Sequence, residues 1–325
     1  MAMDVLLIGV SSLVRRRVLP ALLKLERVAS IHVASRRPFE ASLVPPERLG
    51  RYWQGYGEAL QECPPCLAYV SLPNAMHAEW ARAALAGGFH VIVDKPAFTA
   101  DCSQAQALVD LARGESRVLA EADVWSWHPL AQRAREAADT GGLAPRAVIA
   151  TFTSPAMDPG DFRYRKELGG GALLDRGSYA ASCGRFFFSE EPVAVSCAIL
   201  GYSEAAGVDT SFSVVLHYPG GVLFGYFSLE SEYQNRVEII GSSVACSVDR
   251  VFTPPADYAG SICVRSANRL SRVDVPAADS FAAFVDDVLD AIEQRDCCRH
   301  SSLLLEDARV LERLARSVVG GTHVD

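Results

Sequence analysis

Short apolar segments alternate with helix-forming segments along the first third of the chain, and this alternation constrains the fold more than any other feature. The apolar segments are 4–9, 30–35, 67–72, 89–94 and 117–121. Helix-forming segments at 13–25, 78–86 and 101–113 lie between them. Fully apolar strands are typical of a parallel sheet that helices cover on both faces. Residues 1–122 are therefore predicted to form a Rossmann-type, doubly wound α/β domain.

The pattern changes after residue 122. A helix is predicted over 129–138 and a strand over 146–152, and apolar residues then recur with period two on both sides of the turn at 219–221, as in an antiparallel hairpin. Further strands are expected near 236–240 and 245–249, and helices over 280–294 and 302–318. Residues 123–325 are predicted to be an α+β domain with a largely antiparallel open sheet, which binds substrate and mediates oligomerisation.

Composition limits the classes of function. The chain has 325 residues, enough for two domains, and 31 basic against 39 acidic residues, so no basic excess favours a nucleic-acid partner. No apolar run approaches the ~18 residues of a membrane span, and no membrane partner is expected. Nine cysteines, an odd number, indicate thiols in a reducing compartment, which we take to be the cytoplasm. No metal site is predicted, because Cys297, Cys298 and His300 have no second ligand pair at a zinc-like spacing.

The first strand-to-helix turn carries one glycine of a dinucleotide fingerprint. The fingerprint would have glycine at positions 9, 11 and 14, and only Gly9 is present. Ser11 is small enough for a pyrophosphate to approach the backbone. The residues expected to contact a cofactor here are Gly9, Ser11, Ser12 and Leu13. A turn without a ligand is the alternative.

The end of the second strand indicates which cofactor. An NAD-binding domain carries an acid there for the ribose 2′-hydroxyl, whereas this chain has Ser35, Arg36 and Arg37. Guanidinium groups suit a 2′-phosphate. NADP(H) is therefore predicted in preference to NAD(H), with a solvated basic loop as the alternative.

Two longer motifs resemble the Gfo/Idh/MocA oxidoreductases. The first reads PNAMH at 73–77 and continues through FHV at 89–91 to DKP at 94–96. The second reads GGGALLDRGSY at 169–179. Segments 18–22, 34–36, 160–164 and 249–255 look like the NDP-hexose 3-ketoreductases of that family, some of which also lack fingerprint glycines.

The resemblance, together with the chemistry of the side chains, suggests the site. Lys95 follows a buried strand, where an ammonium can stabilise a developing alkoxide, and Tyr179 can supply the proton. Asp175 lies four residues before Tyr179 on one helix face and would hold a substrate hydroxyl or orient Lys95. A nearby Lys95 would lower the pKa of Tyr179. The other residues expected to contact cofactor are Leu72, Pro73, Asn74, His77 and Lys95, and those expected to contact substrate are Arg163, Tyr164, Asp175 and Tyr179.

For several of these residues, a purely structural or solvated role is an alternative. His77 could equally cap or pack a helix, and Arg163 could be solvated. Arg176 is expected to form a surface ion pair rather than to meet a diphosphate.

The resemblance implies an NADPH-dependent ketoreductase that transfers hydride to a ketone of a sugar, with a nucleotide-linked keto-hexose as the expected substrate. The same chemistry on another polyol, a sugar phosphate or an imine is an alternative, as is a catalytically silent NADP-binding regulator.

The hairpin is apolar on both faces: Phe212, Val214, Leu216, Phe224 and Tyr226 are assigned to one, and Val215, Leu223 and Phe227 to the other. Since helices cover one face only, a homodimer or tetramer through this sheet is predicted.

Overall fold

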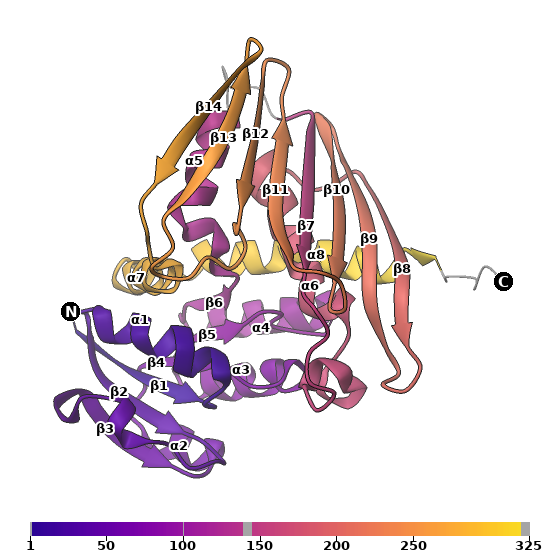
Figure 1. Ribbon diagram of the computed structural model, residues 1–325. Coiled ribbons are helices and arrows are strands. Elements are labelled where there is room, and N and C mark those ends of the chain that lie inside the picture. Colours follow the sequence, from indigo (N-terminus) through magenta and orange to yellow (C-terminus); the bar gives the residue numbers. More distant parts are fainter. Residues whose placement is uncertain (1, 100, 139–144, 320–325) are drawn as a thin grey trace. The chain divides into compact units, whose positions relative to one another are not determined.

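The computed structural model describes residues 2–99, 101–138 and 145–319, and the chain divides into two compact units (Figure 1). The first unit comprises Met1–Ala122 and Phe281–Leu305, and the second comprises Asp123–Ser280 and Glu306–Asp325. The division expected from the sequence has the same boundary after Ala122. It differs for Phe281–Leu305, which the sequence placed in the second domain and which packs in the first unit.

The described residues of the first unit contain a six-stranded sheet in the order β3-β2-β1-β4-β5-β6. Its strands are β1 Met3–Ile8, β2 Val28–Ala34, β3 Leu49–Trp53, β4 Leu67–Val70, β5 His90–Asp94 and β6 Leu119–Ala122. All of its strand pairs are parallel. This strand order is that of dinucleotide-binding domains, so the predicted Rossmann-type sheet is confirmed. The sequence analysis did not foresee β3.

Most helices of the first unit lie largely within the predicted segments, but α2 Tyr56–Glu62 was not predicted from the sequence. They are α1 Leu19–Lys24, α2 Tyr56–Glu62, α3 His77–Ala86, α4 Cys102–Gly114 and α7 Ser280–Glu293, with short 3₁₀ turns at Ala41–Leu43, Pro46–Arg48 and Asn74–Met76. The helix expected over 13–25 begins instead with a wide π-helical turn, Val14–Val18, in which the Leu19 N–H donates to the Val14 carbonyl. Pro20 has no N–H to continue a regular ladder at this point.

The second unit contains, within the described residues, a nine-stranded sheet in the order β14-β13-β12-β11-β7-β10-β9-β8-β15. Its strands are β7 Ala147–Thr153, β8 Ala194–Ser203, β9 Val208–Tyr218, β10 Gly221–Ser228, β11 Gln234–Ile240, β12 Val244–Asp249, β13 Gly260–Ser266, β14 Arg269–Val275 and β15 Val318–Val319. Only the β7–β10 and β8–β15 pairs are parallel. The predicted largely antiparallel open sheet is confirmed.

Helices α5 Pro129–Ala138 and α6 Ala172–Phe188 cover one face of this sheet, and α8 Arg299–Arg316 precedes β15 (Figure 1). Short 3₁₀ turns lie at Val124–Trp127, Phe162–Tyr164 and Lys166–Leu168. Trp125 is fully buried in the core, where its ring contacts Phe186 and Phe252 at centroid distances of 5.0 and 5.3 Å. Its indole N–H donates to Ser182 Oγ at 2.9 Å, so this polar group is satisfied inside the core.

The register of the β9–β10 hairpin corrects the faces expected from the sequence. Leu223 pairs with Leu216, and Phe227 pairs with Phe212, so these four residues are buried together beneath the helices. Phe224 and Tyr226 lie on the opposite, open face and are 45% and 36% exposed. The sequence analysis assigned them to the Phe212 face. The assignment was wrong because Tyr218 pairs directly with Gly221, and this tight turn sets the pleat of the second strand.

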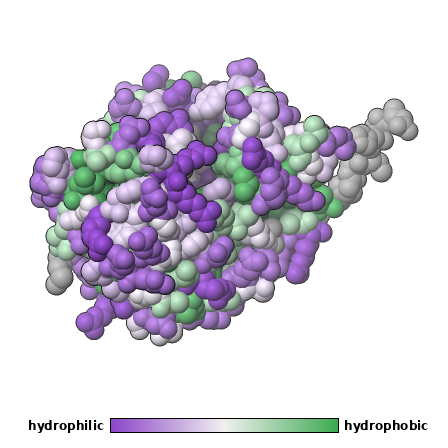
Figure 2. Space-filling model, turned by 90° about the horizontal axis from the view of Figure 1, so that it is seen from below, coloured by the Kyte–Doolittle hydropathy of each residue, from purple (hydrophilic) through white to green (hydrophobic). Residues whose placement is uncertain are grey.

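Hydrophilic residues predominate on the face drawn in Figure 2, where hydrophobic residues form small separate patches. None of the helices in the described part of the chain has the length and apolar character that crossing a membrane requires.

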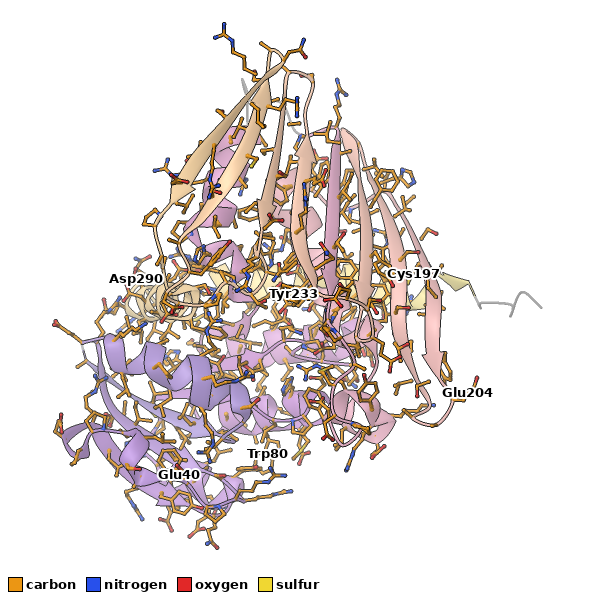
Figure 3. All side chains as sticks on the ribbon, in the orientation of Figure 1. Glu40, Trp80, Cys197, Glu204, Tyr233 and Asp290 are labelled. Atoms are coloured by element: carbon orange, nitrogen blue, oxygen red, sulfur yellow. The ribbon has the colours of Figure 1, made fainter. Side chains whose placement is uncertain are left out.

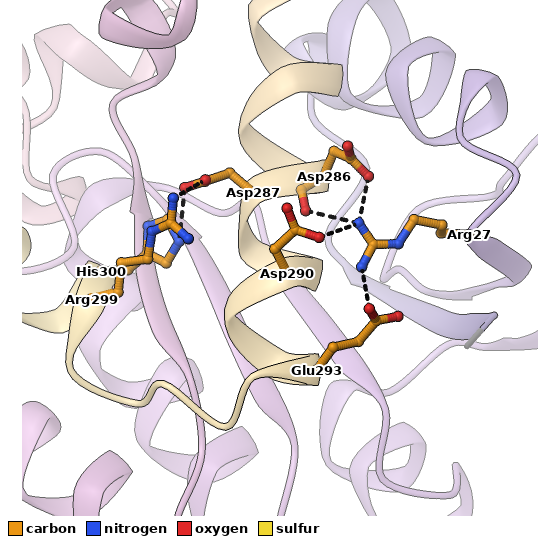
Figure 4. A network of polar contacts seen from close by, with 7 residues as sticks. All are labelled: Arg27, Asp286, Asp287, Asp290, Glu293, Arg299 and His300. Atoms are coloured by element: carbon orange, nitrogen blue, oxygen red, sulfur yellow. Dashed lines mark hydrogen bonds and ion pairs between the residues drawn. The ribbon is translucent and has the colours of Figure 1, made fainter.

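An ion-pair cluster explains why Phe281–Leu305 belongs to the first unit. Asp290, labelled in Figure 3, lies on α7, and its Oδ1 accepts from Arg27 Nη1 at 2.7 Å (Figure 4). The same guanidinium contacts Asp286 Oδ1 at 2.8 Å and Glu293 Oε2 at 3.0 Å. Arg27 precedes β2, so the partners lie more than 250 positions apart in the chain. Local sequence patterns cannot reveal such a pairing.

Arg185 and Asp307 give a prediction for the stability of the second unit. The guanidinium donates to both carboxylate oxygens, at 2.8 and 2.7 Å, and the Asp307 side chain is only 6% exposed. Arg185→Met should lower the free energy of unfolding by about 3–5 kcal/mol, because it leaves a buried charge without its partner. Denaturant unfolding measures this, with Arg133→Met at an exposed ion pair as the control.

The same variant should show a characteristic pH dependence. Burial raises the pKa of the Asp307 carboxyl, while Arg185 lowers it. Removing Arg185 raises this pKa further, so Asp307 takes up a proton more readily and the stability deficit should shrink as the pH falls. A deficit that is equal at pH 5 and pH 8 would contradict this account of the pair.

Candidate active site

The first strand-to-helix turn is closed tightly against β4. Gly9 has φ +92°, and a Cβ added to it would lie 2.3 Å from the Ser71 carbonyl oxygen, so a side chain is excluded there. Ser11 Oγ accepts from the Val14 N–H at 3.1 Å and lies 2.8 Å from Ser71 Oγ. At the position of the second fingerprint glycine, the Ser11 hydroxyl therefore stabilises the turn through a hydrogen bond. Ser12 is exposed and Leu13 is partly buried, which leaves the turn accessible to a ligand.

The loop after β2 offers fixed positive charge. Ser35 is buried, and its Oγ accepts from the Arg37 N–H at 3.2 Å, while Tyr52 Oη donates to the Ser35 carbonyl at 3.1 Å. The Arg36 guanidinium lies 5.1 Å from the Tyr56 ring centroid. Arg36 and Arg37 are both exposed. A rigid backbone with two accessible guanidinium groups fits a phosphate, so this loop fits the 2′-phosphate of NADP.

Lys95 lies in a turn that the first unit holds from two sides. The Ala97 N–H donates to Glu121 Oε1 at 2.7 Å, and the Pro96 carbonyl lies 2.6 Å from His77 Nδ1. His77 Nε2 lies 2.7 Å from the Leu72 carbonyl, and the side chain is 1% exposed. Both ring nitrogens of His77 thus contact backbone carbonyls, and neither is directed at a cofactor. This agrees with the alternative that His77 packs in the structure instead of binding a cofactor. Asn74 is also buried, at 3% exposure.

In the second unit, a glycine run shapes the start of α6. The N–H groups of Gly170 and Gly171 donate to the carbonyls of Arg165 and Arg163, at 3.0 and 2.9 Å. A Cβ on Gly170 would lie 2.5 Å from the Arg163 carbonyl oxygen, so only glycine allows this approach. The loop that carries Arg163 and Tyr164 is thereby drawn against the first turn of α6.

Asp209 fixes the same helix terminus, and the sequence analysis missed it. Its Oδ2 accepts from the Leu173 N–H at 2.6 Å, which satisfies a backbone donor at the N-terminus of α6. A residue 36 positions downstream carries no local signal of capping.

The four residues predicted to contact substrate lie on α6 or in the loop before it. Asp175 is 4% exposed, and its Oδ2 lies 3.1 Å from Arg163 Nε. Tyr179, one turn further along the helix, is 8% exposed. Tyr164 lies in the same loop as Arg163, and its Oη accepts from the Met157 N–H at 3.3 Å. Arg163 is therefore paired rather than freely solvated.

Arg176 corrects an expectation. The sequence analysis placed it in a surface ion pair, but it is 5% exposed and donates to the Phe152 carbonyl at 2.8 Å and to Ser154 Oγ at 2.7 Å. Its guanidinium also lies 4.3 Å from the Phe152 ring centroid. The residue faces the interior because Phe152 and Ser154, at the end of β7, provide acceptors there.

Tyr179 lies in an aromatic environment that keeps its proton on. Its ring lies 5.1 Å from the rings of both Phe152 and Phe252. Burial raises the pKa of the Tyr179 phenol well above its usual value, and the carboxylates of Asp123 and Asp175 raise it further. The sequence analysis expected Lys95 to lower this pKa and did not foresee Asp123, which directly follows β6. A phenol in this environment keeps its proton at neutral pH.

These features define a class of protein. The first unit has the strand order, the glycine-tight turn and the basic loop of a nicotinamide-dinucleotide-binding domain. The second unit presents Asp175, Tyr179 and arginines beside one helix on an open sheet. A two-domain, dinucleotide-dependent oxidoreductase combines such parts.

Comparison with known proteins identifies the family. The oxidoreductase family with an NAD-binding Rossmann fold matches residues 3–122, and the GFO/IDH/MocA C-terminal domain matches residues 131–245. This chain belongs to the GFO/IDH/MocA oxidoreductases, as its motifs predicted, and it is an NAD(P)-dependent oxidoreductase.

Several of the similar proteins are 3-reductases of nucleotide-linked sugars. A dTDP-3,4-didehydro-2,6-dideoxy-alpha-D-glucose 3-reductase from Saccharopolyspora spinosa is 34% identical, with 86% of each chain covered. A reductase of the same name from Actinomadura kijaniata is 33% identical over 91% of this chain and 92% of that one. A solved 3-ketoreductase from Actinomadura kijaniata, in complex with NADP and TDP-benzene, matches with TM-score 0.91 and 29% identity over 98% and 99% of the two chains. The predicted resemblance to NDP-hexose 3-ketoreductases is confirmed.

Proposed function

We propose that this protein is an NADPH-dependent ketoreductase that reduces a ketone of a nucleotide-linked keto-hexose. The observation that carries the proposal is the state of Tyr179, an interior phenol whose pKa is raised by burial and which lies one helical turn from Asp175. Such a phenol keeps the proton that reduction of a ketone requires. The similarity to dTDP-sugar 3-reductases supports the class of substrate.

Lys95 and Tyr179 carry the chemistry in this proposal. The Lys95 ammonium stabilises negative charge on the substrate oxygen, and Tyr179 Oη delivers a proton to that oxygen. Solved structures of the Actinomadura kijaniata 3-ketoreductase include variants in which one lysine or one tyrosine is replaced. Those two residues are separated by the same number of positions as Lys95 and Tyr179, which supports their assignment.

Asp175 and the arginines around it hold the substrate. The Asp175 carboxylate has one oxygen on Arg163, and it accepts a substrate hydroxyl in this proposal. Arg163 and Tyr164 contact the remainder of the sugar nucleotide. The pairing of Arg163 with Asp175 keeps both groups in place before substrate arrives.

The first unit holds the cofactor, which supplies the hydride when bound. Gly9, Ser11, Ser12 and Leu13 receive its pyrophosphate, because the turn is open to solvent at Ser12 and has no side chain at Gly9. Ser35, Arg36 and Arg37 bind its 2′-phosphate. Leu72, Pro73 and Asn74 border its nicotinamide half. The buried ring of His77 contacts the Leu72 carbonyl and so holds this loop in place.

We also propose a reducing compartment such as the cytoplasm for the protein. Five buried cysteines are free thiols: Cys63, Cys66, Cys183, Cys197 and Cys246.

The choice of cofactor gives a second prediction. Each arginine–phosphate contact contributes roughly 1.5–3 kcal/mol, so NADPH should bind at least about tenfold more tightly than NADH. Arg36→Ala combined with Arg37→Ala should remove most of this preference and leave NADH affinity nearly unchanged. Titration by energy transfer from protein to nicotinamide measures it, with Arg82→Ala on the exposed face of α3 as the control. Equal affinities in the unmodified protein would refute the assignment.

The catalytic pair gives a third prediction. Tyr179→Phe removes only a hydroxyl and should slow the single-turnover oxidation of NADPH by a keto-sugar nucleotide by about 10²–10⁴-fold. Lys95→Ala should slow it by about 10²–10³-fold. The two losses should not add, because both groups act on one oxygen. Both variants should bind NADPH normally, which a cofactor titration checks.

Matched controls separate chemistry from folding. Tyr202→Phe and Lys166→Ala change exposed residues of the same types and should retain the full rate. A wild-type rate in Tyr179→Phe would place the proton source elsewhere. Loss of NADPH binding in both site variants would instead make the two residues structural.

The open face of the second sheet gives a fourth prediction. Ile149 and Phe224 are register partners on β7 and β10, exposed by 37% and 45%, and Val215 of β9 faces Phe224 on the other side. We propose that a second copy of the chain covers this apolar stripe. Light scattering at micromolar concentration should show a dimer or tetramer, and Phe224→Asp should shift it towards monomer. Leu270→Asp, near the tip of the β13–β14 hairpin, is the control; a monomeric unmodified protein would contradict the proposal.

A further inference from the structure

His77 lies between two acceptors. Its Nδ1 is 2.6 Å from the Pro96 carbonyl oxygen, and its Nε2 is 2.7 Å from the Leu72 carbonyl oxygen. The side chain is 1% exposed. Backbone carbonyls only accept hydrogen bonds, so each ring nitrogen needs a proton to make its contact.

A neutral imidazole cannot satisfy this arrangement. It carries one N–H, so its other nitrogen would point a lone pair at a carbonyl lone pair in a buried place. The imidazolium donates from both nitrogens. The short distances are also typical of charge-assisted hydrogen bonds.

Other histidines of this chain have the opposite arrangement. His32, His90 and His128 each accept a backbone N–H at Nδ1, from Arg51, Val118 and Leu130 respectively. A nitrogen that accepts carries no proton. Burial, assisted by the charge of Arg117, lowers the pKa of His90 to about 4, in keeping with a neutral ring. These three histidines therefore do not make the pair of carbonyl contacts that His77 makes.

A negative group to balance the charge lies at the end of β5. Asp94 accepts from Tyr69 Oη at 2.8 Å and from Ser71 Oγ, and both bonds favour the carboxylate. Burial raises the pKa of Asp94, while the charge of His77 is the foremost influence that lowers it, ahead of these hydrogen bonds and Lys95. Glu121 is the other carboxylate that holds this turn, through the Ala97 N–H.

We propose that His77 is an imidazolium at neutral pH and acts as a positioning residue, whose two N–H groups tie the turn that carries Lys95 to the Leu72 loop. The importance of the Lys95 turn rests on the proposed function. His77 passes no proton to substrate. Its charge holds the Pro96 carbonyl, and through it the adjoining Lys95, at a fixed distance from the segment that borders the nicotinamide half of the cofactor.

Nuclear magnetic resonance of the unmodified protein tests the charge without any assay of activity. In protein labelled with ¹⁵N at histidine, both ring nitrogens of His77 should give protonated-type signals at pH 7.5. His90 should show one protonated and one bare nitrogen in the same spectrum. His77→Gln assigns the resonance, and a neutral tautomer at His77 would overturn the proposal.

A pH titration of the same sample tests the positioning. Where the ring signals of His77 change from those of a protonated ring to those of a neutral ring, the amide resonances of Lys95 and Ala97 should shift in the same step, because the Pro96 contact is lost. Unmoved Lys95 and Ala97 amides through that step would overturn the positioning role. This readout needs no variant to fold.

Kinetics of His77→Gln complete the test. Glutamine can donate to one carbonyl but carries no charge, so kcat should fall about 10–100-fold, as small misplacements of catalytic groups do. The KM for the keto-sugar nucleotide should change much less. His90→Gln is the matched control and should keep its kcat. A wild-type kcat in His77→Gln would overturn the proposal, whereas an active Lys95→Ala would refute the proposed function and leave the imidazolium signal in place.

Discussion

The close approach of Gly9 to the Ser71 carbonyl is the constraint on which the first unit depends. It brings the ends of β1 and β4 together, and no residue with a Cβ can occupy that position. From this point a chain of polar contacts runs from Ser11 through Ser71 to Asp94. Lys95 follows Asp94 directly, so the Gly9 turn and Lys95 share one hydrogen-bonded framework. At the second fingerprint position, the Ser11 hydroxyl hydrogen-bonds to the Val14 N–H and to Ser71 Oγ.

The second unit depends in a similar way on the start of α6. Glycines let the Arg163 loop approach the helix, and Asp209 satisfies a donor at its first turn. Asp175 and Tyr179 then lie one turn apart on α6, most of whose residues are buried. The arginines nearby are paired or hydrogen-bonded, so this polar cluster is ordered by the protein itself.

Much of the fold, and the family, could be predicted from the sequence. Apolar runs and helix formers predicted the parallel sheet, and two motifs predicted the family, both of which are confirmed. What the sequence did not predict depends on partners distant in the chain. Arg27 joins α7 to the first unit, Phe152 and Ser154 draw Arg176 inside, and Asp209 caps a helix 36 residues before it. The side of the sheet on which Phe224 lies depends on the register of the β9–β10 turn. A period-two pattern alone does not determine that register.

The central claim is that this chain moves hydride to a ketone of a sugar nucleotide. The most direct measurement uses NADPH deuterated at the transferring position of C4, together with a dTDP-linked 3-keto sugar, and analyses the product by mass spectrometry. The account predicts one deuterium on the former carbonyl carbon of the sugar. A product without deuterium, or no reduced sugar from protein that binds NADPH, would contradict it.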